Sequence, residues 1–329
     1  MTAAMPADPN IVLEARNLSL FLRQDRTELR IVDDVSFCVA RGEFFALIGE
    51  SGSGKTTIAK AAMRLLPVGQ LRIAGSLNVT GVDVASAPEH VMRKLRGQSM
   101  SMIFQEPMTS LNPIMTIEAQ IAEALQAHQT LSVAAQRERI MQLLNDVRFD
   151  NPAKVAAQYP HELSGGMRQR AMIAIALVND PLLLIADEPT TALDVTIQQE
   201  VLDILVRLQA KYQLSVFFIS HDLALVNRYA NRIGVLYGGV LMETGPTAEV
   251  IGRPAHPYTE ALLACMPRMR DGAMRQAGVE GNVPRVDHWF DGCRFAPRCA
   301  HVRADCHGKP IDISAVSSTQ SARCLHPLI

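Results

Sequence analysis

The sequence predicts an α/β fold in which helices cover a mainly parallel sheet, with an inserted helical subdomain and a small C-terminal module. Two observations carry this prediction. Short apolar runs with turn-prone boundaries recur at residues 35–48 and 182–220, as buried strands do. Between them, at about residues 97–180, helical periodicity dominates. We therefore place an α/β domain at 11–250 and the C-terminal module, with its altered composition, at 251–329.

The individual elements follow in order along the chain. Apolar runs bounded by turn residues predict strands, and apolar residues at three- and four-residue spacing predict helices. The predicted strands span residues 35–39, 44–48, 182–186 and 216–220. The predicted helices span residues 56–66, 116–128, 132–147, 165–178 and 197–212.

Composition limits the classes of function. The 329 residues are 48% hydrophobic, which is enough for a sizeable core. With 32 Lys plus Arg against 33 Asp plus Glu, the net charge of -1 gives no global reason to expect a nucleic-acid partner. No apolar run approaches the roughly 20 residues that cross a bilayer, and residues 1–10 do not resemble a secretory signal. We expect a chain in the cytoplasm that does not itself span a membrane.

A glycine-rich loop follows the predicted strand at 44–48 and precedes a helix. Its sequence fits the P-loop pattern: Gly49, Glu50, Ser51, Gly52, Ser53, Gly54, Lys55 and Thr56. The glycines let successive backbone N–H groups face phosphates, Lys55 adds a positive charge, and the Thr56 hydroxyl can ligate Mg²⁺. The chain is therefore predicted to be a P-loop nucleotide-binding protein.

Two carboxylates, Asp187 and Glu188, end the predicted strand at 182–186. In a P-loop enzyme this placement puts an acidic residue beside the Mg²⁺ of the nucleotide. We assign Asp187 to the metal. Glu188, one residue later, is expected to take a proton from the attacking water as general base.

A second anion site is predicted at the segment Leu-Ser-Gly-Gly-Met-Arg-Gln-Arg, residues 163–170. Ser164, Gly165 and Gly166 open a helix, whose unpaired N–H groups and dipole attract anions. The segment resembles the signature motif of ABC proteins. That resemblance implies that this helix end closes over the γ-phosphate of ATP held by an opposing subunit.

Other residues match the ABC cassette in order. Gln105 resembles the Q-loop residue that touches Mg²⁺ and water, and Asp194 resembles the D-loop aspartate that communicates across the dimer. His221, after the strand at 216–220, resembles the switch histidine that contacts the γ-phosphate. The platform for adenine stays open between Phe21 and a residue elsewhere.

Within the ABC superfamily the chain resembles the ATP-binding subunits of oligopeptide/dipeptide and nickel importers, on residues 105–113, 187–196 and 256–259. The resemblance implies a RecA-like core, an antiparallel β subdomain and an inserted ABC helical subdomain. It further implies an ATPase that powers import of peptides or a related small solute, at the cytoplasmic face of the inner membrane. The implied partners are two permease subunits, a second ATP-binding subunit, in our reading a paralogue, and an extracytoplasmic solute-binding protein. The cargo, and whether the two ATPase subunits are identical, stay open.

We expect Glu188, His221 and Gln105 to be catalytic, and Thr56, Gln105 and Asp187 to hold Mg²⁺. The residues expected to bind ATP are Gly49, Glu50, Ser51, Gly52, Ser53, Gly54, Lys55, Thr56, Thr57, Gln105, Asp187, Ser164, Gly165, Gly166 and Asp194.

Four of the six cysteines, Cys293, Cys299, Cys306 and Cys324, lie within 32 residues of the C-terminal module. In a cytoplasmic protein a thiolate–metal site is a better interpretation than disulfides. The spacers of five, six and seventeen residues lack the tight knuckle of structural zinc and favour a [4Fe–4S] cluster. Zinc and free thiols stay as alternatives.

Two other classes of function compete with an importer ATPase. One is an ABC ATPase that acts on DNA or ribosomes, which would usually carry two cassettes or a long coiled-coil insertion. The other is a regulatory iron–sulfur protein with a vestigial cassette. The chain has one set of motifs, no such insertion, and a competent residue at each catalytic position. These features favour the importer ATPase.

Overall fold

The computed structural model falls into two compact units. The first unit contains the chain up to Leu13, Val39–Glu43 and Asn78–Phe218, and the second contains Glu14–Cys38, Phe44–Leu77 and Ile219–Ile329. The residues that the structure describes are 10–24, 27–66, 69–105, 110–191, 193–265, 268–270, 273–275, 279, 281–284 and 291–329. Residues 106–109 and Ala192, which carry part of the family resemblance, therefore lie outside the described residues.

Parallel strands form the centre of the first unit. β6 (Met100–Ile103) and β7 (Leu183–Asp187) pair in parallel, with Met100 opposite Leu183 and Ile103 opposite Ala186. β8 (Ser215–Ser220), whose first four residues belong to this unit, is the next strand after β7. All residues of β7 and β8 are buried, which explains why both read as continuous apolar runs in the sequence.

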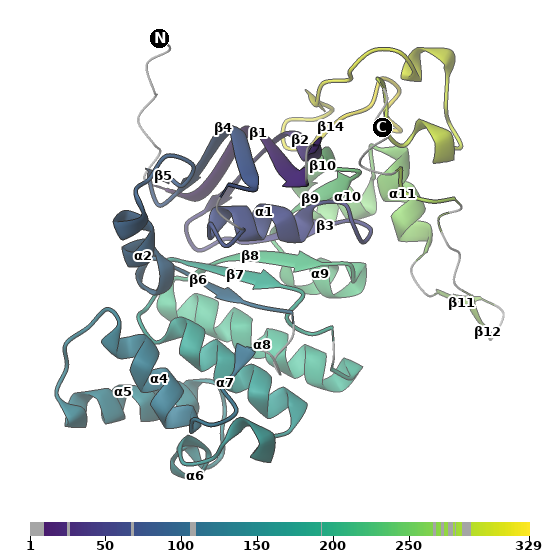
Figure 1. The fold of residues 1–329 in the computed structure, drawn as a ribbon. Coiled ribbons are helices and arrows are strands. Elements are labelled where there is room, and N and C mark those ends of the chain that lie inside the picture. Colours follow the sequence, from purple (N-terminus) through teal and green to yellow (C-terminus); the bar gives the residue numbers. More distant parts are fainter. Residues whose placement is uncertain are drawn as a thin grey trace. The chain divides into compact units, whose positions relative to one another are not determined.

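The helices of the first unit confirm the predicted periodicity. α4 (Ile117–Gln126) and α5 (Val133–Asp146) lie within a residue or two of the predicted ranges, and their N-cap side chains, Thr116 and Ser132, accept backbone N–H groups. They gather near α6 and α7 at the lower end of Figure 1. The remaining elements of this unit are β5 (Val82–Asp83), α2 (Glu89–Gln98), α6 (Pro152–Ala156), the 3-10 turn η1 (Pro160–Glu162), α7 (Gly165–Leu177) and α8 (Val195–Tyr212).

The second unit contains two sheets. One has the strand order β2-β1-β4, from β1 (Ile11–Gln24), β2 (Thr27–Ala40) and β4 (Leu71–Val79). The other has the order β13-β14-β10-β9-β3, in which β3 (Phe44–Ile48) runs parallel to β9 (Arg232–Tyr237). The helices of this unit are α1 (Lys55–Ala62), α9 (Leu223–Tyr229), α10 (Thr247–Gly252) and α11 (Pro257–Ala264).

The C-terminal chain joins the second of these sheets. β14 (Ser321–Ala322) pairs antiparallel with β10 (Val240–Pro246), so that Ala322 lies opposite Glu243, and β13 (Ser314–Ala315) pairs with β14. Glu243 is fully buried and accepts the backbone N–H groups of Ala255 and His256. The other short elements are β11 (Arg268–Arg270), β12 (Ala273–Arg275) and the 3-10 turns η2 (Ala296–Arg298) and η3 (Ala304–Cys306). This chain end is therefore built into the sheet that also holds β3.

Two predicted elements differ from the structure in length. The helix after the glycine-rich loop, predicted to reach residue 66, ends at Ala62, because Arg64 adopts a left-handed backbone conformation with φ of 53°. The strand predicted at 35–39 is the end of the 14-residue β2. In the described part of the chain, no helix combines the length and apolar character that a bilayer crossing requires.

Candidate functional site

The glycine-rich loop connects the fully buried β3 to α1. Its conformation depends on glycine: Gly49, Gly52 and Gly54 have φ of 150°, 79° and 100°, values that other residues seldom adopt. The Lys55 ammonium lies inside the loop and donates hydrogen bonds to the carbonyl oxygens of Gly49 and Glu50 at 2.8 and 2.9 Å. The positive charge of Lys55 is thus held at the centre of the turn, where it can attract a phosphate group. Thr56 and Thr57 follow in the first turn of α1 and are half-buried.

Gly49 is the position in this loop where a side chain has no room. A Cβ there would lie 2.0 Å from the carbonyl oxygen of Leu236 in β9, in addition to the strain of its φ of 150°. We expect Gly49→Ala to lower the free energy of unfolding by more than about 2 kcal/mol, because backbone rather than a movable side chain is in the way. Urea denaturation measures this. Gly252→Ala, where the added Cβ meets nothing within 4 Å, is the matched control, and equal stability of the two variants would contradict the expectation.

Gln105 and Glu188 come together at one edge of the first unit. Gln105 follows β6 and Glu188 follows β7, and the carboxyl ends of two parallel strands meet at the same edge. The Gln105 amide donates a hydrogen bond of 3.3 Å to the Glu188 carboxylate, which also accepts one of 2.8 Å from the Thr191 hydroxyl. Gln105 is exposed, whereas Asp187 is only 2% exposed. Gln105, Asp187 and Glu188 thus stand at the ends of two neighbouring strands, whereas Thr56, the third predicted Mg²⁺ ligand, lies in α1 of the second unit.

Glu188 has an unusual backbone. Its φ of 45° lies in the left-handed region, which is uncommon for a residue with a long side chain. The preceding strand residues point alternately to the two faces of the sheet, and this turn breaks that alternation at Glu188. Strained conformations of this kind concentrate at functional sites. The sequence predicted the residue but carried no signal for this conformation.

The signature segment forms a capped helix end. The Ser164 hydroxyl accepts the N–H of Met167 at 3.3 Å as the N-cap of α7, and Gly165 and Gly166 form the first turn. A Cβ at Gly166 would lie 2.7 Å from Cγ2 of Ile197 in α8. The absence of a side chain therefore lets the start of α7 approach the start of α8 closely.

Asp194 belongs to the same region of the first unit. It is exposed and is the N-cap of α8, where its carboxylate accepts the N–H of Ile197 at 3.0 Å. Because Ile197 is also the neighbour of Gly166, the structure brings the predicted D-loop residue next to the signature segment.

The remaining predicted residues lie in the second unit. His221 is exposed, directly follows β8, and precedes Asp222, the N-cap of α9. Phe21, the candidate adenine platform, carries the Arg72 guanidinium over its ring at 3.7 Å from the centroid. Arg72 is held there by paired hydrogen bonds to Glu28 at 2.8 and 2.6 Å. One face of the Phe21 ring is therefore already covered.

The four clustered cysteines line one small cavity in the second unit. Cys293, Cys299, Cys306 and Cys324 all contribute to its wall, together with His256, Ala296 and Ile311 among others. Burial, and after it the charges of the three neighbouring thiols, raise the pKa of Cys293 to about 11. Burial likewise raises the pKa of Cys299 and Cys324. Cysteines up to 31 positions apart in sequence thus line one cavity.

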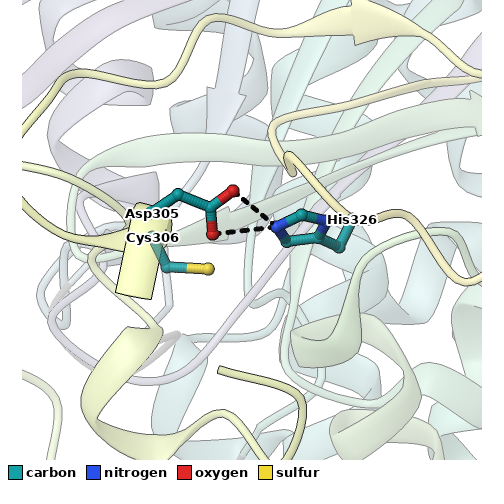
Figure 2. Close-up of side chains that lie close together, drawn as sticks. All are labelled: Asp305, Cys306 and His326. Atoms are coloured by element: carbon teal, nitrogen blue, oxygen red, sulfur yellow. Dashed lines mark hydrogen bonds and ion pairs between the residues drawn. The ribbon is translucent and has the colours of Figure 1, made fainter. Parts of the chain in front are cut away.

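A tighter group lies at one side of this cavity. Figure 2 shows Asp305, Cys306 and His326, whose ligand atoms lie within 4.8 Å of one another. His326 Nε2 lies 2.9 Å from both carboxylate oxygens of Asp305, a contact that lowers the pKa of that carboxyl. Sequence reasoning missed Asp305 and His326, since nothing in their spacing sets them apart from surface residues.

Two known protein families match this chain. Residues 32–191 match the family of ABC transporters, and residues 242–306 match the C-terminal region of oligopeptide/dipeptide transporters. A putative peptide import ATP-binding protein of Brucella abortus (strain 2308) is 42% identical over 324 residues, which cover 98% of this chain and 97% of the relative. The chain belongs to the oligopeptide/dipeptide importer family of ABC ATP-binding subunits. A second relative, from Brucella ovis, is also a putative peptide import ATP-binding protein, 43% identical over 95% of this chain and 96% of its own length.

Solved structures place the cassette in the same fold. A dimeric ATP-binding cassette in a post-hydrolysis state, bound to ADP and Pi, matches 71% of this chain and 98% of its own with a TM-score of 0.63 at 24% identity. An ATP-binding subunit of an ABC transporter matches 73% of this chain and 91% of its own with a TM-score of 0.59 at 29% identity. The chain is an ABC-type ATPase of P-loop fold, and membership of an importer family implies membrane permease partners.

The structure also gives the ABC cassette contacts that sequence reasoning missed. The Tyr258 hydroxyl accepts the backbone N–H of Glu50 at 3.0 Å, and the Arg298 guanidinium pairs with the Glu50 carboxylate at 2.9 Å. Tyr258 lies in the stretch 256–259, which carries part of the family resemblance. The sequence therefore singled out this residue, but it did not predict that Tyr258 contacts Glu50. Arg298 had no such signal. Both residues reach the P-loop from more than 200 positions away.

Proposed function

We propose that this subunit binds and hydrolyses Mg-ATP to power import of peptides or a related small solute through an ABC transporter. The observation that carries the proposal is the pairing of Gln105 with Glu188 at the ends of two parallel strands. It sets a carboxylate beside a group that can orient water, which is the arrangement a general base for hydrolysis requires. The names of the relatives support peptides as the class of cargo.

The main predicted site residues have the following roles in this proposal. Lys55 and the N–H groups of the loop bind the β- and γ-phosphates, and Thr56, Gln105 and Asp187 hold Mg²⁺. Glu188 takes a proton from the attacking water, and His221 contacts the γ-phosphate. Ser164, Gly165 and Gly166 contribute the capped start of α7, and the dipole and unpaired N–H groups of a helix start favour an anion. Asp194 signals between the two ATP-binding subunits.

The proposed assembly has two permeases and a second ATP-binding subunit, which we take to be a paralogue. An extracytoplasmic solute-binding protein delivers the cargo, and this chain sits peripherally at the cytoplasmic face of the membrane. ATP binding closes the two cassettes and hydrolysis reopens them, a movement that the permeases follow. The proposed ABC domain spans 11–250, with its helical subdomain at about 97–180, and the proposed C-terminal module spans 251–329.

Transport assays test the importer directly. The subunit, its permeases and its partner ATPase are reconstituted in vesicles, and uptake of a radiolabelled di- or oligopeptide pool is followed with the binding protein present. Uptake that requires ATP and stops with ADP supports the proposal. If ATP is hydrolysed and a nickel chelate or a sugar is taken up while peptides are not, peptides are not the cargo.

We further propose that the C-terminal module binds a [4Fe–4S] cluster through Cys293, Cys299, Cys306 and Cys324. Four thiols line one cavity, which is the number of thiolates that such a cluster requires. Among the described residues, three possible metal-ligand atoms lie within 4.8 Å of one another in Asp305, Cys306 and His326. No three of the four thiols, all of which belong to described residues, lie this close together. A single zinc ion would draw its sulfur ligands to about 3.8 Å. The cluster would tie together distant parts of the module.

Removal of one ligand tests the cluster. Cys306 is 8% exposed and lines the cavity, so we expect Cys306→Ser, purified without oxygen, to lose most of the iron and acid-labile sulfide of the unaltered protein. The unaltered protein should contain about four irons per chain. Cys265→Ser, whose thiol lies outside the cavity and donates to the Ala261 carbonyl, is the control and should keep its iron. Zinc in place of iron would overturn the cluster and favour the site formed with Asp305 and His326.

A further inference from the structure

Glu50, the second residue of the phosphate-binding loop, is held from both its main chain and its side chain. Its N–H donates to the Tyr258 hydroxyl at 3.0 Å, and its carboxylate accepts two hydrogen bonds from Arg298 at 3.1 and 2.9 Å. Tyr258 is fully buried, and burial raises its pKa well above the ordinary range, so this hydroxyl stays protonated. The loop that is to receive ATP is therefore held by groups from α11 and η2.

Arg298 is fixed in position by several further contacts. Its side chain is 5% exposed, against 25% for Glu50, and it also donates to the Tyr237 hydroxyl at 3.2 Å and to the Val279 carbonyl at 2.8 Å. A guanidinium with this many fixed hydrogen bonds acts as a rigid fork rather than a mobile surface charge. It also neutralises a carboxylate that would otherwise repel the triphosphate bound by the same loop.

The rest of the short segment 293–299 makes contacts of the same kind. Phe295 packs edge-on against Tyr237, with ring centroids 5.4 Å apart, and its ring is tilted against that of Tyr258, with centroids 5.2 Å apart. Arg294 donates to the Gly238 carbonyl, in the turn where the N–H of Gly239 donates to the Ser53 carbonyl of the loop at 3.1 Å. Arg298 therefore contacts the phosphate-binding loop directly, and Phe295 and Arg294 contact residues beside it.

The two ends of the same segment are cysteines of the cavity. Cys293 and Cys299 both line it, and Cys299 directly follows Arg298. A change that moves either cysteine must move a chain of only five intervening residues, three of which pack toward the loop. The segment is short and has the 3-10 turn η2 in its middle, so little slack is available to absorb such a movement.

We propose that Arg298 is a positioning residue of the nucleotide site, and that segment 293–299 couples the cysteine-lined cavity to the affinity of the loop for ATP. The inference rests on the proposed function, because it takes the loop to be the ATP site. Arg298 and Tyr258 hold Glu50 in place without touching the nucleotide. When the cysteines hold their ligand, segment 293–299 is fixed and the loop keeps the conformation that binds ATP. When the ligand is lost, the segment can move and the affinity of the loop for ATP falls.

The test is a double-mutant cycle on the purified full-length chain. Binding of Mg-ATP is measured by displacement of a fluorescent nucleotide analogue in the unaltered protein, Arg298→Gln, Glu50→Gln and the double variant. We expect Arg298→Gln to weaken binding about tenfold when residue 50 is Glu, the effect of leaving a carboxylate without its charged partner. The same change should weaken binding less than about twofold when residue 50 is Gln. Arg298→Lys, which keeps the charge, should recover part of the loss.

Two results would overturn the proposal. One is an Arg298→Gln effect of equal size with Glu or Gln at position 50, which would mean a structural role without charge compensation. The other is unchanged ATP affinity in Cys299→Ser, with Cys265→Ser as control, while its iron content falls. Iron and thermal unfolding are measured for every variant, so that misfolding is recognised. Binding of Mg-ATP by the unaltered chain reports the proposed function by itself, whereas differences between the Arg298 variants report this inference.

Discussion

Glu188→Gln is expected to bind Mg-ATP nearly as well as the unaltered subunit while hydrolysis by the assembled transporter falls by more than about 100-fold. The substitution keeps the size of the side chain and its hydrogen bonds to Gln105 and Thr191 but removes the group that accepts the proton. Release of phosphate and binding of a fluorescent ATP analogue measure the two effects separately. An assembly trapped with ATP should accumulate as a result.

The control for this variant is another carboxylate in the same unit. Glu138 lies on the exposed face of α5, so Glu138→Gln removes the same charge far from the strand ends. It should leave hydrolysis within about twofold of the unaltered value. If Glu188→Gln hydrolyses ATP as fast as Glu138→Gln, Glu188 is not the base.

Lys55→Ala should act at the earlier step and weaken binding of Mg-ATP by more than about 100-fold. The ammonium is 5% exposed and holds the loop closed through the carbonyl oxygens of Gly49 and Glu50. Its loss removes both the charge for the phosphates and two of the hydrogen bonds that shape the turn. Equilibrium binding of the fluorescent analogue to the full-length chain is the measurement.

Lys60→Ala is the matched control, since Lys60 is a half-buried lysine in the last turn of the same helix. It should bind Mg-ATP within about twofold of the unaltered chain, because a single surface charge one turn and a half away contributes little. Equal binding by Lys55→Ala and Lys60→Ala would show that the loop does not hold the nucleotide.

Much of the nucleotide site could be predicted because its signals are local. The strand at 44–48 is observed as β3 with the same ends, since five consecutive apolar residues between turn signals describe a buried strand. Ser164 was predicted to open a helix and is the N-cap of α7 in the structure, where a short polar side chain satisfies a backbone N–H group. The side-by-side position of Gln105 and Glu188 was not predicted, because it depends on β6, a strand inside the range 97–180 where helical periodicity was expected, pairing in parallel with β7.

Other features could not be predicted because they depend on contacts between distant residues. Arg298 and Tyr258 reach Glu50 across 248 and 208 positions, and no periodicity connects them. The left-handed conformation of Glu188 is imposed by its surroundings, since Glu has no preference for it. The end of α1 at Ala62 was missed for a local reason, because the chain turns at Arg64 rather than at a glycine, the residue that usually marks a helix end.

In the proposed assembly, the start of α7 must act on ATP that another subunit holds. Ser164→Arg tests this most directly, because it places a bulky charge at the helix end without altering the phosphate-binding loop of its own chain. In the purified assembly with permeases and second ATPase subunit, we expect phosphate release to fall by more than about 100-fold, while the separate chain still binds Mg-ATP with its ordinary affinity. Hydrolysis that survives this change, or a separate chain that loses its own ATP, would contradict the account.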